Sequence, residues 1–373
     1  MNKTPYPDFS SIADAVNSPA IIDFDRPVWI FGAGNFGCTL YKAMSSRGIK
    51  VSGFVETIPL ASSTLDLPVI DWATLAKRSD KVQLALGIFN RAAPFDELAA
   101  LAFKAGFDNV LMPWDTYDIF FQELGWRFWL SRRDFLLSAL DRIKQVAERV
   151  ADRQSYDILL RVAAFRLGLD ISFASFQSPE RQYFNEITLP PLQGKSITYV
   201  DCGAYNGDTY TDLASQPGTR CLRAYLLEPD PKNFAELVKN LENHKSEAIC
   251  LPLAAGDKYQ TLKFSSGQGE GGALGISGDI HVATIALDQM LGNNHVDCIK
   301  MDVEGAEDQV LQGARRIINN CRPVLAMSLY HNPQDLWYLP ELLFDICMDY
   351  DIYIRQHCFN SFDLVLYAIP RSD

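Results

Sequence analysis

The sequence lacks any apolar run that approaches the roughly 18 residues needed for a membrane-spanning helix. Its N-terminus also lacks the basic start and apolar core of a signal peptide. We therefore expect a soluble protein that stays in the cytoplasm and has no membrane partner. With 373 residues, 48% of them apolar, the chain is too long for one small module and too apolar for wholesale disorder.

Positive charge is scarce relative to negative charge. Lys and Arg number 34 against 46 Asp and Glu, which gives a net charge of −12. Such a chain repels the phosphate backbone of nucleic acids and anionic lipid headgroups, so neither is expected as a main partner.

Closely spaced cysteine pairs are absent as well. None of the eight cysteines belongs to a C-x-x-C pair, and several lie inside apolar, strand-like runs. This distribution predicts reduced, mostly buried thiols.

The chain divides into three segments by its apolar pattern. Residues 1–113 alternate apolar runs with helical stretches, which predicts a smaller Rossmann-like α/β domain of the nucleotide-binding type. Residues 114–190 are expected to form a helical linker, and residues 191–373 return to the α/β alternation. The strands expected in the first segment are 28–31, 51–55, 82–89 and 109–112. The apolar stripe expected on one helix face of the linker is Leu136, Leu140, Ile143, Ala147 and Val150.

The C-terminal segment predicts a doubly wound sheet. Five strands are followed by helices or crossover loops, and the chain ends in two strands joined by a turn at residues 360–361. The ligand crevice of such a sheet lies at the carboxyl ends of its strands. The five expected strands are 197–201, 223–228, 248–253, 297–302 and 324–329, and the terminal pair is 353–355 and 364–369.

A glycine turn follows the first of these strands. Its spacing is G-x-x-x-G, which differs from the G-x-G-x-x-G fingerprint that presents amides to a pyrophosphate, so a ligand without phosphates fits better. Glu228 ends the next strand, where a carboxylate can accept both hydroxyls of a ribose. Turn and acid describe an adenosine pocket with S-adenosylmethionine as the phosphate-free candidate, although any strand-to-helix turn favours glycine. Asp257, after the third strand, is placed to accept from an adenine amino group. The predicted cofactor-binding residues are Asp201, Gly203, Ala204, Asn206, Gly207, Asp208, Thr209, Glu228 and Asp257.

Several motifs in this half together resemble the FkbM-type methyltransferases. They are residues 201–209, Glu228-Pro229, the run Lys-Met-Asp-Val-Glu-Gly-Ala-Glu at 300–307, residues 330–337 and residues 366–370. The resemblance spans roughly residues 180–370. It implies a class I methyltransferase sheet that depends on S-adenosylmethionine and O-methylates a sugar, a glycan or a related natural product. The acidic chain suits such a neutral small-molecule or glycan acceptor and a cationic sulfonium.

Three residues at strand ends are predicted to carry the chemistry. Of only five histidines, His331 alone directly follows a core strand at the ligand edge, and we expect it to be the base that removes the acceptor proton. The alternative is that His331 only lies on a well-capped turn. Asp302 and Glu304 lie two apart at a strand end and would orient the acceptor hydroxyl.

A divalent cation is an open alternative at the same place. Asp302, Glu304, His331 and Asn332 together would supply ligands for magnesium, which lowers the pKa of a bound hydroxyl. Carboxylates ahead of a helix also stabilise its N-terminus, so no metal ligands are assigned, and Glu307 is expected to act as a helix cap.

Glycines crowd residues 267–278, between two short strands expected at 261–264 and 281–285. A lid over the acceptor and a long disordered loop are both consistent with this composition.

The N-terminal segment carries a true G-x-G-x-x-G between a strand and a helix. Its glycines are Gly32, Gly34 and Gly37, and Glu56 follows the second strand at the spacing of a ribose acid. NAD or a nucleotide-sugar is therefore a candidate ligand, although only about four strands precede the helical segment, fewer than a full dinucleotide fold has. A structural or dimerising remnant is the alternative, which leaves a homo-oligomer open. The competing function is a nucleotide or nucleotide-sugar sensor with a non-catalytic methyltransferase scaffold.

Overall fold

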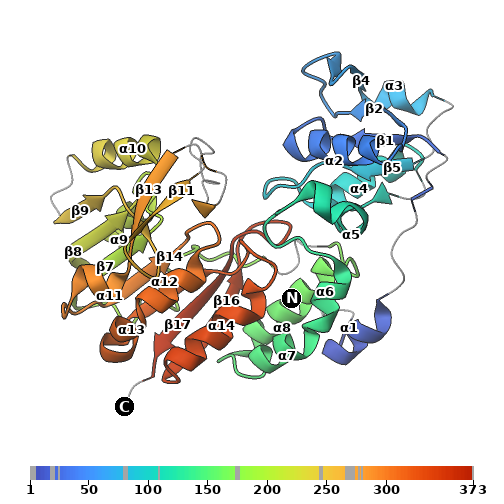
Figure 1. Ribbon diagram of the computed structural model, residues 1–373. Coiled ribbons are helices and arrows are strands. Elements are labelled where there is room, and N and C mark those ends of the chain that lie inside the picture. Colours follow the sequence, from blue (N-terminus) through green and yellow to red (C-terminus); the bar gives the residue numbers. More distant parts are fainter. Residues whose placement is uncertain are drawn as a thin grey trace. The chain divides into compact units, whose positions relative to one another are not determined.

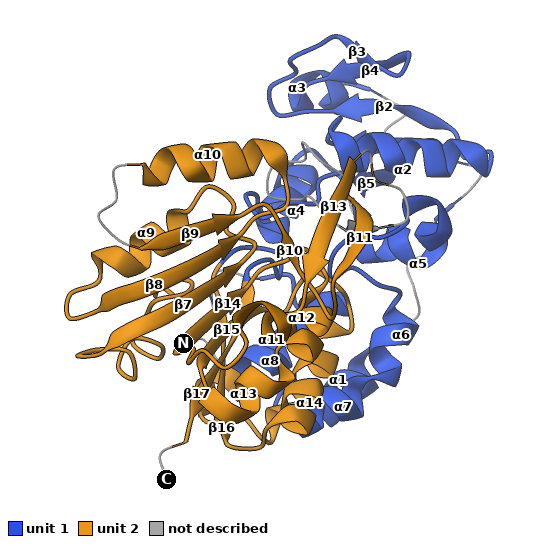
Figure 2. Ribbon diagram, turned by 60° about the vertical axis from the view of Figure 1, so that its left-hand side comes forward, with its two compact units in different colours: residues 1–145, 157–177, 358–363 blue, residues 146–156, 178–357, 364–373 orange. Residues whose placement is uncertain are grey.

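The computed structural model describes residues 6–16, 22–23, 26–78, 83–107, 110–172, 177–242, 247–264, 274–275, 278 and 280–371. The chain forms two compact units, coloured separately in Figure 2. Unit 1 comprises residues 1–145, 157–177 and 358–363, and unit 2 comprises residues 146–156, 178–357 and 364–373. Neither compact unit is a continuous stretch of chain. The units therefore do not test the bounds of the three segments predicted from the sequence, which stay a prediction.

Unit 1 is built on one six-stranded sheet in the order β3-β4-β2-β1-β5-β6. All neighbouring pairs are parallel except β3 with β4. Strand β1 is buried along its whole length, as an apolar run at the centre of a parallel sheet must be. The strands are β1 (Val28–Phe31), β2 (Val51–Val55), β3 (Ser63–Thr64), β4 (Leu67–Ile70), β5 (Gln83–Leu86) and β6 (Val110–Leu111).

Helices α2 (Asn35–Ser46), α3 (Trp72–Ala76), α4 (Phe95–Lys104) and α5 (Pro113–Leu124) lie beside this sheet (Figure 1). The other helices of this half of the chain are α1 (Phe9–Ala15), α6 (Arg133–Ser138), α7 (Leu140–Ala147) and α8 (Arg153–Arg166), and the last two cross the boundary between the units. An aromatic cluster fills part of the unit: the ring of Phe95 stacks on that of Phe165, and Trp129 lies between Phe89 and Phe165.

Two expectations for the first half need correction. The sheet has more strands than the four expected, because β4 and the short β3 were not predicted. The apolar stripe does not lie on one continuous helix: α6 ends at Ser138, α7 begins at Leu140, and Val150 follows the end of α7. Leu136, Leu140 and Ile143 are nevertheless all buried, so burial follows the pattern even though the helix is interrupted. Residues 82 and 109 lie outside the described residues.

Unit 2 confirms the doubly wound sheet with an antiparallel C-terminal hairpin. Its seven strands lie in the order β16-β17-β15-β14-β7-β8-β9. The neighbours among β15, β14, β7, β8 and β9 are parallel, whereas β17 is antiparallel to both β15 and β16. The strands are β7 (Ser196–Cys202), β8 (Arg220–Leu227), β9 (Ala248–Leu251), β14 (Cys298–Met301), β15 (Val324–Ser328), β16 (Tyr350–Gln356) and β17 (Leu364–Pro370). The helices are α9 (Asp208–Ser215), α10 (Pro231–Leu241), α11 (Leu287–Leu291), α12 (Glu307–Gly313), α13 (Arg315–Cys321) and α14 (Asp335–Ile346).

A second, four-stranded sheet stands between β9 and β14 in the chain. It has the order β10-β13-β11-β12, formed by β10 (Ala254–Ala255), β11 (Gln260–Phe264), β12 (Leu274–Gly275) and β13 (Ile280–Ile285). The two short strands expected on either side of the glycine-rich segment are confirmed as β11 and β13. Most of that segment, including Gly267, Gly269, Gly271 and Gly272, lies outside the described residues, so the lid stays a prediction.

Residues 146–156 are tied into unit 2 by a buried charge. The guanidinium of Arg355, on β16, is 4% exposed and pairs with the carboxylate of Asp152 at 2.6 Å. The backbone N–H of Ile354 donates to Ser155 Oγ, and that of Ala151 donates to the carbonyl of Ile352. In the described part of the chain, no helix is both long and apolar enough to cross a membrane.

Candidate functional site

The glycine turn after β7 is folded directly against the end of β14. Gly203 has a φ of +82°, and a Cβ there would overlap the backbone oxygen of Asp302. The N–H groups of Gly203 and Ala204 both donate to the carbonyl of Leu227, at 3.0 and 2.9 Å. The turn therefore lies where β14, β7 and β8 end side by side, and only glycine fits at position 203.

Glu228 follows β8 and binds the turn through its carboxylate. Tyr205 donates its backbone N–H to Oε2 over 2.8 Å, and Asp230 donates its own to Oε1 over 2.9 Å. The side chain is nearly inaccessible, with the residue 5% exposed. Burial raises the pKa of Glu228 to about 7, although the two N–H donors oppose that rise. A carboxylate has four lone-pair positions, so acceptor capacity remains for two ligand hydroxyls.

Asp201 lies beneath the turn, where Lys300 neutralises it. Both side chains are buried, and Nζ of Lys300 lies 3.1 Å from Asp201 Oδ1. The same ammonium donates to the carbonyl of Gly203, and the Tyr199 hydroxyl donates to Asp201 Oδ2. Burial lowers the pKa of Lys300, but the charges of Asp201 and Asp302 outweigh burial and raise it above its ordinary value. Asp201 thus supports the backbone of the turn from below.

The remaining predicted cofactor residues form the start of α9 and a separate loop. Asn206 Oδ1 accepts the N–H of Asp208, whose carboxylate accepts the N–H of Thr209, and Gly207 precedes the helix. Asp208 therefore places a negative charge in the first turn of α9. Asp257 is exposed in the turn between β10 and β11, where its contacts with Lys258 and Gln260 are local, and its adenine role stays a prediction.

The structure brings the three predicted catalytic residues together. Nε2 of His331 lies 3.3 Å from Asp302 Oδ1 and 3.5 Å from Glu304 Oε2. On its other side, Nδ1 lies 2.7 Å from Oε1 of Glu307. His331 is fully buried, whereas the side chains of Asp302 and Glu304 are 24% and 14% exposed. The two carboxylates therefore face solvent in front of a histidine that does not.

Further residues hold the Asp302 carboxylate in place. The Tyr183 hydroxyl donates to Oδ2 over 2.9 Å, and the Ser328 hydroxyl donates to Oδ1 over 2.8 Å. Both donors lie far from Asp302 in the sequence, and Tyr183 belongs to an irregular segment that was expected to be helical linker. The sequence contains no local signal for these contacts.

Glu304 is held in an uncommon backbone conformation. Its φ of +56° is in the left-handed region, which a residue with a Cβ seldom occupies. Glu307, expected only as a cap, accepts the backbone N–H groups of Val303 and Gly305 and also contacts His331. The loop between β14 and α12 is thus folded back so that Glu304 reaches the histidine.

The charges in this cluster decide the protonation of its members. Burial lowers the pKa of His331, but Glu307 and Glu304 together raise it to about 10. Burial raises the pKa of Asp302, yet the charges of Lys300 and His331 leave it below its ordinary value. At neutral pH, His331 is consequently protonated and the carboxylate of Asp302 beside it is ionised. A histidine that already carries its proton does not fit the base role expected for His331.

Asp302, Glu307 and His331 each offer one atom suited to a metal ion, and these atoms lie within 4.8 Å of one another. Two carboxylates and an imidazole are an acceptable ligand set for a divalent cation. Asn332 donates to the carbonyl of Gly305 and to Asp335, so its amide supports the loop. The cation stays a prediction.

In unit 1, the predicted residues also come together. Gly32, Gly34 and Gly37 form the turn between β1 and α2, and Glu56 Oε1 accepts the backbone N–H of Ala33 over 2.6 Å.

Comparison with known proteins gives a family for part of the chain. Residues 201–359 match the model of the methyltransferase FkbM domain. The crystal structure of methyltransferase FkbM from Methylobacillus flagellatus KT is similar over 96% of this chain and 98% of that one, with 22% identity and a TM-score of 0.75. That likeness shows a shared fold. No curated protein matches the chain.

Two further solved structures are similar over about half of the chain. Precorrin-6y C5,15-methyltransferase from Geobacter metallireducens GS-15 covers 53% of this chain and 94% of its own, at 13% identity and a TM-score of 0.32. Aeropyrum pernix fibrillarin, solved with natively bound S-adenosyl-L-methionine, covers 48% and 68%, at 14% identity and a TM-score of 0.29.

Proposed function

We propose that this protein, whose residues 201–359 match the methyltransferase FkbM domain, uses S-adenosylmethionine to O-methylate a hydroxyl of a sugar, a glycan or a related natural product. The single observation that carries the proposal is the position of Glu228, a buried carboxylate bonded to the glycine turn at the carboxyl edge of the sheet.

The residues at this edge fit a nucleoside cofactor without phosphates. Glu228 has remaining acceptor capacity for the two hydroxyls of a ribose. Asp208, in the first turn of α9, repels a phosphate but favours a ligand with a positive charge. Gly203 and Ala204 keep the backbone of the turn flat against Leu227, with Lys300 and Asp201 beneath. When bound, S-adenosylmethionine supplies a methyl group on a positively charged sulfur.

The acceptor hydroxyl is held by the carboxylate cluster. Asp302 is ionised and partly exposed, and it accepts the hydrogen bond of the incoming hydroxyl and then its proton. Tyr183 and Ser328 fix the carboxylate, so the hydroxyl is oriented with little loss of freedom at the moment of reaction. Glu304 offers a second acceptor to a neighbouring hydroxyl, which suits a polyol such as a sugar.

His331 serves as a positioning residue in this proposal. Its protonated ring bridges Glu307 on one side and Asp302 and Glu304 on the other, and so keeps two carboxylates facing the same point. Without that positive charge, three carboxylates would crowd one buried space.

Two measurements test the proposal. Calorimetry with S-adenosylhomocysteine should give a 1:1 complex that Glu228→Gln weakens at least about tenfold, while Glu236→Gln, an exposed change on α10, leaves it unchanged. Incubation with S-adenosylmethionine and a panel of glycans should add one methyl mass to an acceptor. Failure of S-adenosylhomocysteine to bind, or equal binding by Glu228→Gln, would refute the cofactor assignment.

The competing function is a nucleotide sensor with an inactive scaffold. A sensor requires no particular arrangement of Asp302, Glu304 and His331. In the structure, however, both carboxylates lie beside Nε2 of His331, at 3.3 and 3.5 Å. A thermal shift with nucleotides, together with no transfer to any acceptor, would favour the sensor.

A further inference from the structure

We propose that unit 1 contains a second ligand site, which binds a ribonucleoside diphosphate at the carboxyl edge of its own sheet. The site consists of the turn at Gly32–Gly37, the carboxylate of Glu56 and a hollow between residues 59–62 and the end of β4. The proposal does not depend on the methyltransferase reaction.

The sheet of unit 1 has the strand order of a dinucleotide-binding fold. Numbered along the chain, its parallel strands β1, β2, β4, β5 and β6 stand in the order third, second, first, fourth, fifth. This is the 3-2-1-4-5-6 order without its last strand, and the order reverses between β1 and β5. In such sheets ligands bind outside the carboxyl ends of the strands at the reversal point, which is where the glycine turn after β1 begins.

The three glycines of the turn differ in what the fold requires of them. Gly32 has a φ of +107°, and a Cβ on Gly37 would overlap the carbonyl oxygen of Gly32, so the fold accounts for both. Gly34 has an ordinary φ of −76°, and a Cβ built there meets no atom within 4 Å. Packing within the described chain gives no reason for glycine at 34, but close approach of a pyrophosphate to the backbone does.

The helix that follows is suited to a phosphate. Helix α2 has no acidic residue in its first turn and no side chain that caps its first N–H groups. Those N–H groups and the positive end of the helix dipole favour an anion. The equivalent helix of unit 2, α9, begins with Asp208. The two turns thus have opposite preferences, which assigns the phosphate-bearing ligand to unit 1.

Glu56 links the turn to the hollow. Its Oε1 accepts from the N–H of Ala33, and its own backbone N–H donates to the carbonyl of Ile70 over 3.0 Å. The carboxylate has further lone pairs, which suit the two hydroxyls of a ribose whose phosphates lie at the turn.

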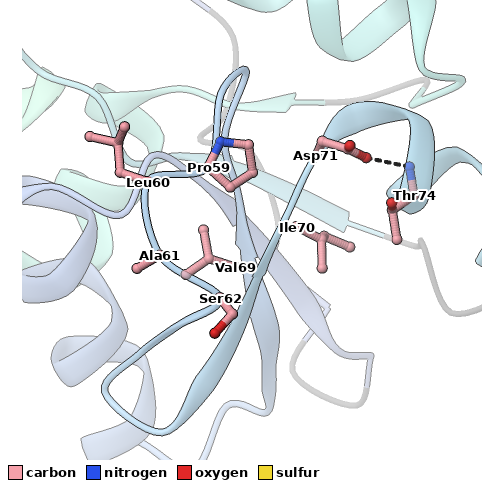
Figure 3. A pocket seen from close by; sticks show the side chains of 8 residues that line it. All are labelled: Pro59, Leu60, Ala61, Ser62, Val69, Ile70, Asp71 and Thr74. Atoms are coloured by element: carbon pink, nitrogen blue, oxygen red, sulfur yellow. Dashed lines mark hydrogen bonds between the residues drawn. The ribbon is translucent and has the colours of Figure 1, made fainter.

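A hollow of about 450 Å³ opens beside Ile70 (Figure 3), within the size range of small-molecule sites. Its lining is mostly apolar and includes Pro59, Leu60, Val69 and Ile70. Leu60 is 97% exposed, so a flat base placed against it would remove that apolar surface from water. Asp71 is directed to the N–H of Thr74 and so leaves the apolar walls to the base.

The turn, the acid and the hollow therefore match phosphates, ribose and base in the order in which a nucleotide presents them. A dinucleotide and a nucleotide-sugar share this chemistry. The test uses the full chain with NAD, ADP and UDP-glucose as separate probes, with binding measured by calorimetry in the presence and absence of saturating S-adenosylhomocysteine.

We expect at least one probe to bind, and Gly34→Ala and Glu56→Gln each to weaken it tenfold or more. S-adenosylhomocysteine should bind both variants as it binds the unchanged chain. NAD or ADP binding alone identifies an adenine nucleotide, and UDP-glucose binding alone identifies a nucleotide-sugar; either result supports the site. Gly34→Ala should keep the melting temperature within a degree or two because its Cβ enters open space.

Three results would overturn the inference. One is the absence of binding by all three probes at millimolar concentration. Another is equal binding by the Gly34→Ala and Glu56→Gln variants. The third is displacement of the nucleotide by S-adenosylhomocysteine, which would place it at the edge of unit 2. None of these results depends on methyl transfer. Loss of the nucleotide site would therefore leave the proposed methyltransferase function intact, and failure of methyl transfer would leave the nucleotide site intact.

Discussion

The backbone N–H of Tyr205 donates to Oε2 of Glu228 over 2.8 Å, so the glycine turn after β7 and the acid after β8 hold each other in place. In unit 1, Ala33 and Glu56 repeat this arrangement at 2.6 Å. In both units the acid that would bind a ribose also fixes the turn beneath the ligand. A change in the charge of that acid should therefore alter ligand affinity and local stability together.

Cofactor affinity should depend on pH through Glu228. Its pKa of about 7 results from burial, and hydroxyl donors favour the ionised form. We expect the affinity for S-adenosylhomocysteine to fall by up to about tenfold for each pH unit below 7. Calorimetry between about pH 5.5 and 8.5 measures this. Glu228→Gln should give a flat profile, and a wild-type profile equally flat would contradict the prediction.

Without ligand, the same group should act on stability in the opposite direction. Because the folded pKa of Glu228 is raised above the unfolded value near 4.3, its contribution is complete below that value and is lost as pH rises through 7. The loss is on the order of 3–4 kcal/mol, from about 1.4 kcal/mol for each unit of pKa difference. Urea unfolding of the ligand-free chain at several pH values tests this, and Glu228→Gln should lose less stability than wild type over that range.

Asp302→Asn should impair turnover far more than cofactor binding. The amide cannot take the proton of the acceptor hydroxyl, so we expect kcat to fall by roughly 10²–10⁴-fold. The Kd for S-adenosylhomocysteine should change less than about twofold, since that ligand lies against Glu228 in the proposal. Asp345→Asn, an exposed change on α14, is the matched control. Turnover within about threefold of wild type would remove Asp302 as the proton acceptor.

His331→Gln should destabilise unit 2 by about 3–5 kcal/mol, because buried carboxylates lose their positive partner. The raised pKa of His331 means that its contribution is complete below about pH 6.5 and lost as pH rises through 10. The stability difference between wild type and variant should therefore shrink toward alkaline pH. Urea unfolding measures it, with exposed His295→Gln as control. A difference that grows above pH 10 would show that the ring is not held protonated.

Gly203→Ala should prevent tight closure of the turn and lower the free energy of unfolding by more than about 2 kcal/mol. The reason is that a Cβ at position 203 would overlap the backbone oxygen of Asp302 and that the φ of Gly203 is positive. Gly256→Ala is the matched control, since the nearest atom to its Cβ would be Thr284 Cβ at an ordinary 3.4 Å. Thermal unfolding of the two variants gives the comparison. Equal melting temperatures would mean that the turn adapts.

The sheet of unit 2 could be predicted from the sequence because its central strands are largely apolar. Strand β15, for instance, is buried at every position and begins with four apolar residues. Strand β4 could not be predicted, because Pro68 interrupts its apolar pattern. The helix break at Ala139 was also missed, since the apolar period continues across it and each half buries the same face.

Within the site, residues at strand ends could be predicted because parallel strands bring their carboxyl ends to one edge. The contacts that determine the protonation and orientation of these residues could not be predicted. Tyr183 reaches Asp302 across 119 positions of sequence, and no local pattern encodes such a contact. The protonation of His331 depends on burial beside Glu307 and Glu304 at once, which is a property of the folded cluster.

The way the chain is shared between the units also limits how this enzyme can be recombined. The chain passes from one unit to the other five times, after residues 145, 156, 177, 357 and 363. A fragment beginning at residue 191 would lack Asp152 and leave the guanidinium of Arg355 buried without its carboxylate. A functional transplant of the methyltransferase half must therefore carry residues 146–156 with it, so natural exchange of this half by a single crossover is disfavoured, and the two units are expected to be inherited as one piece.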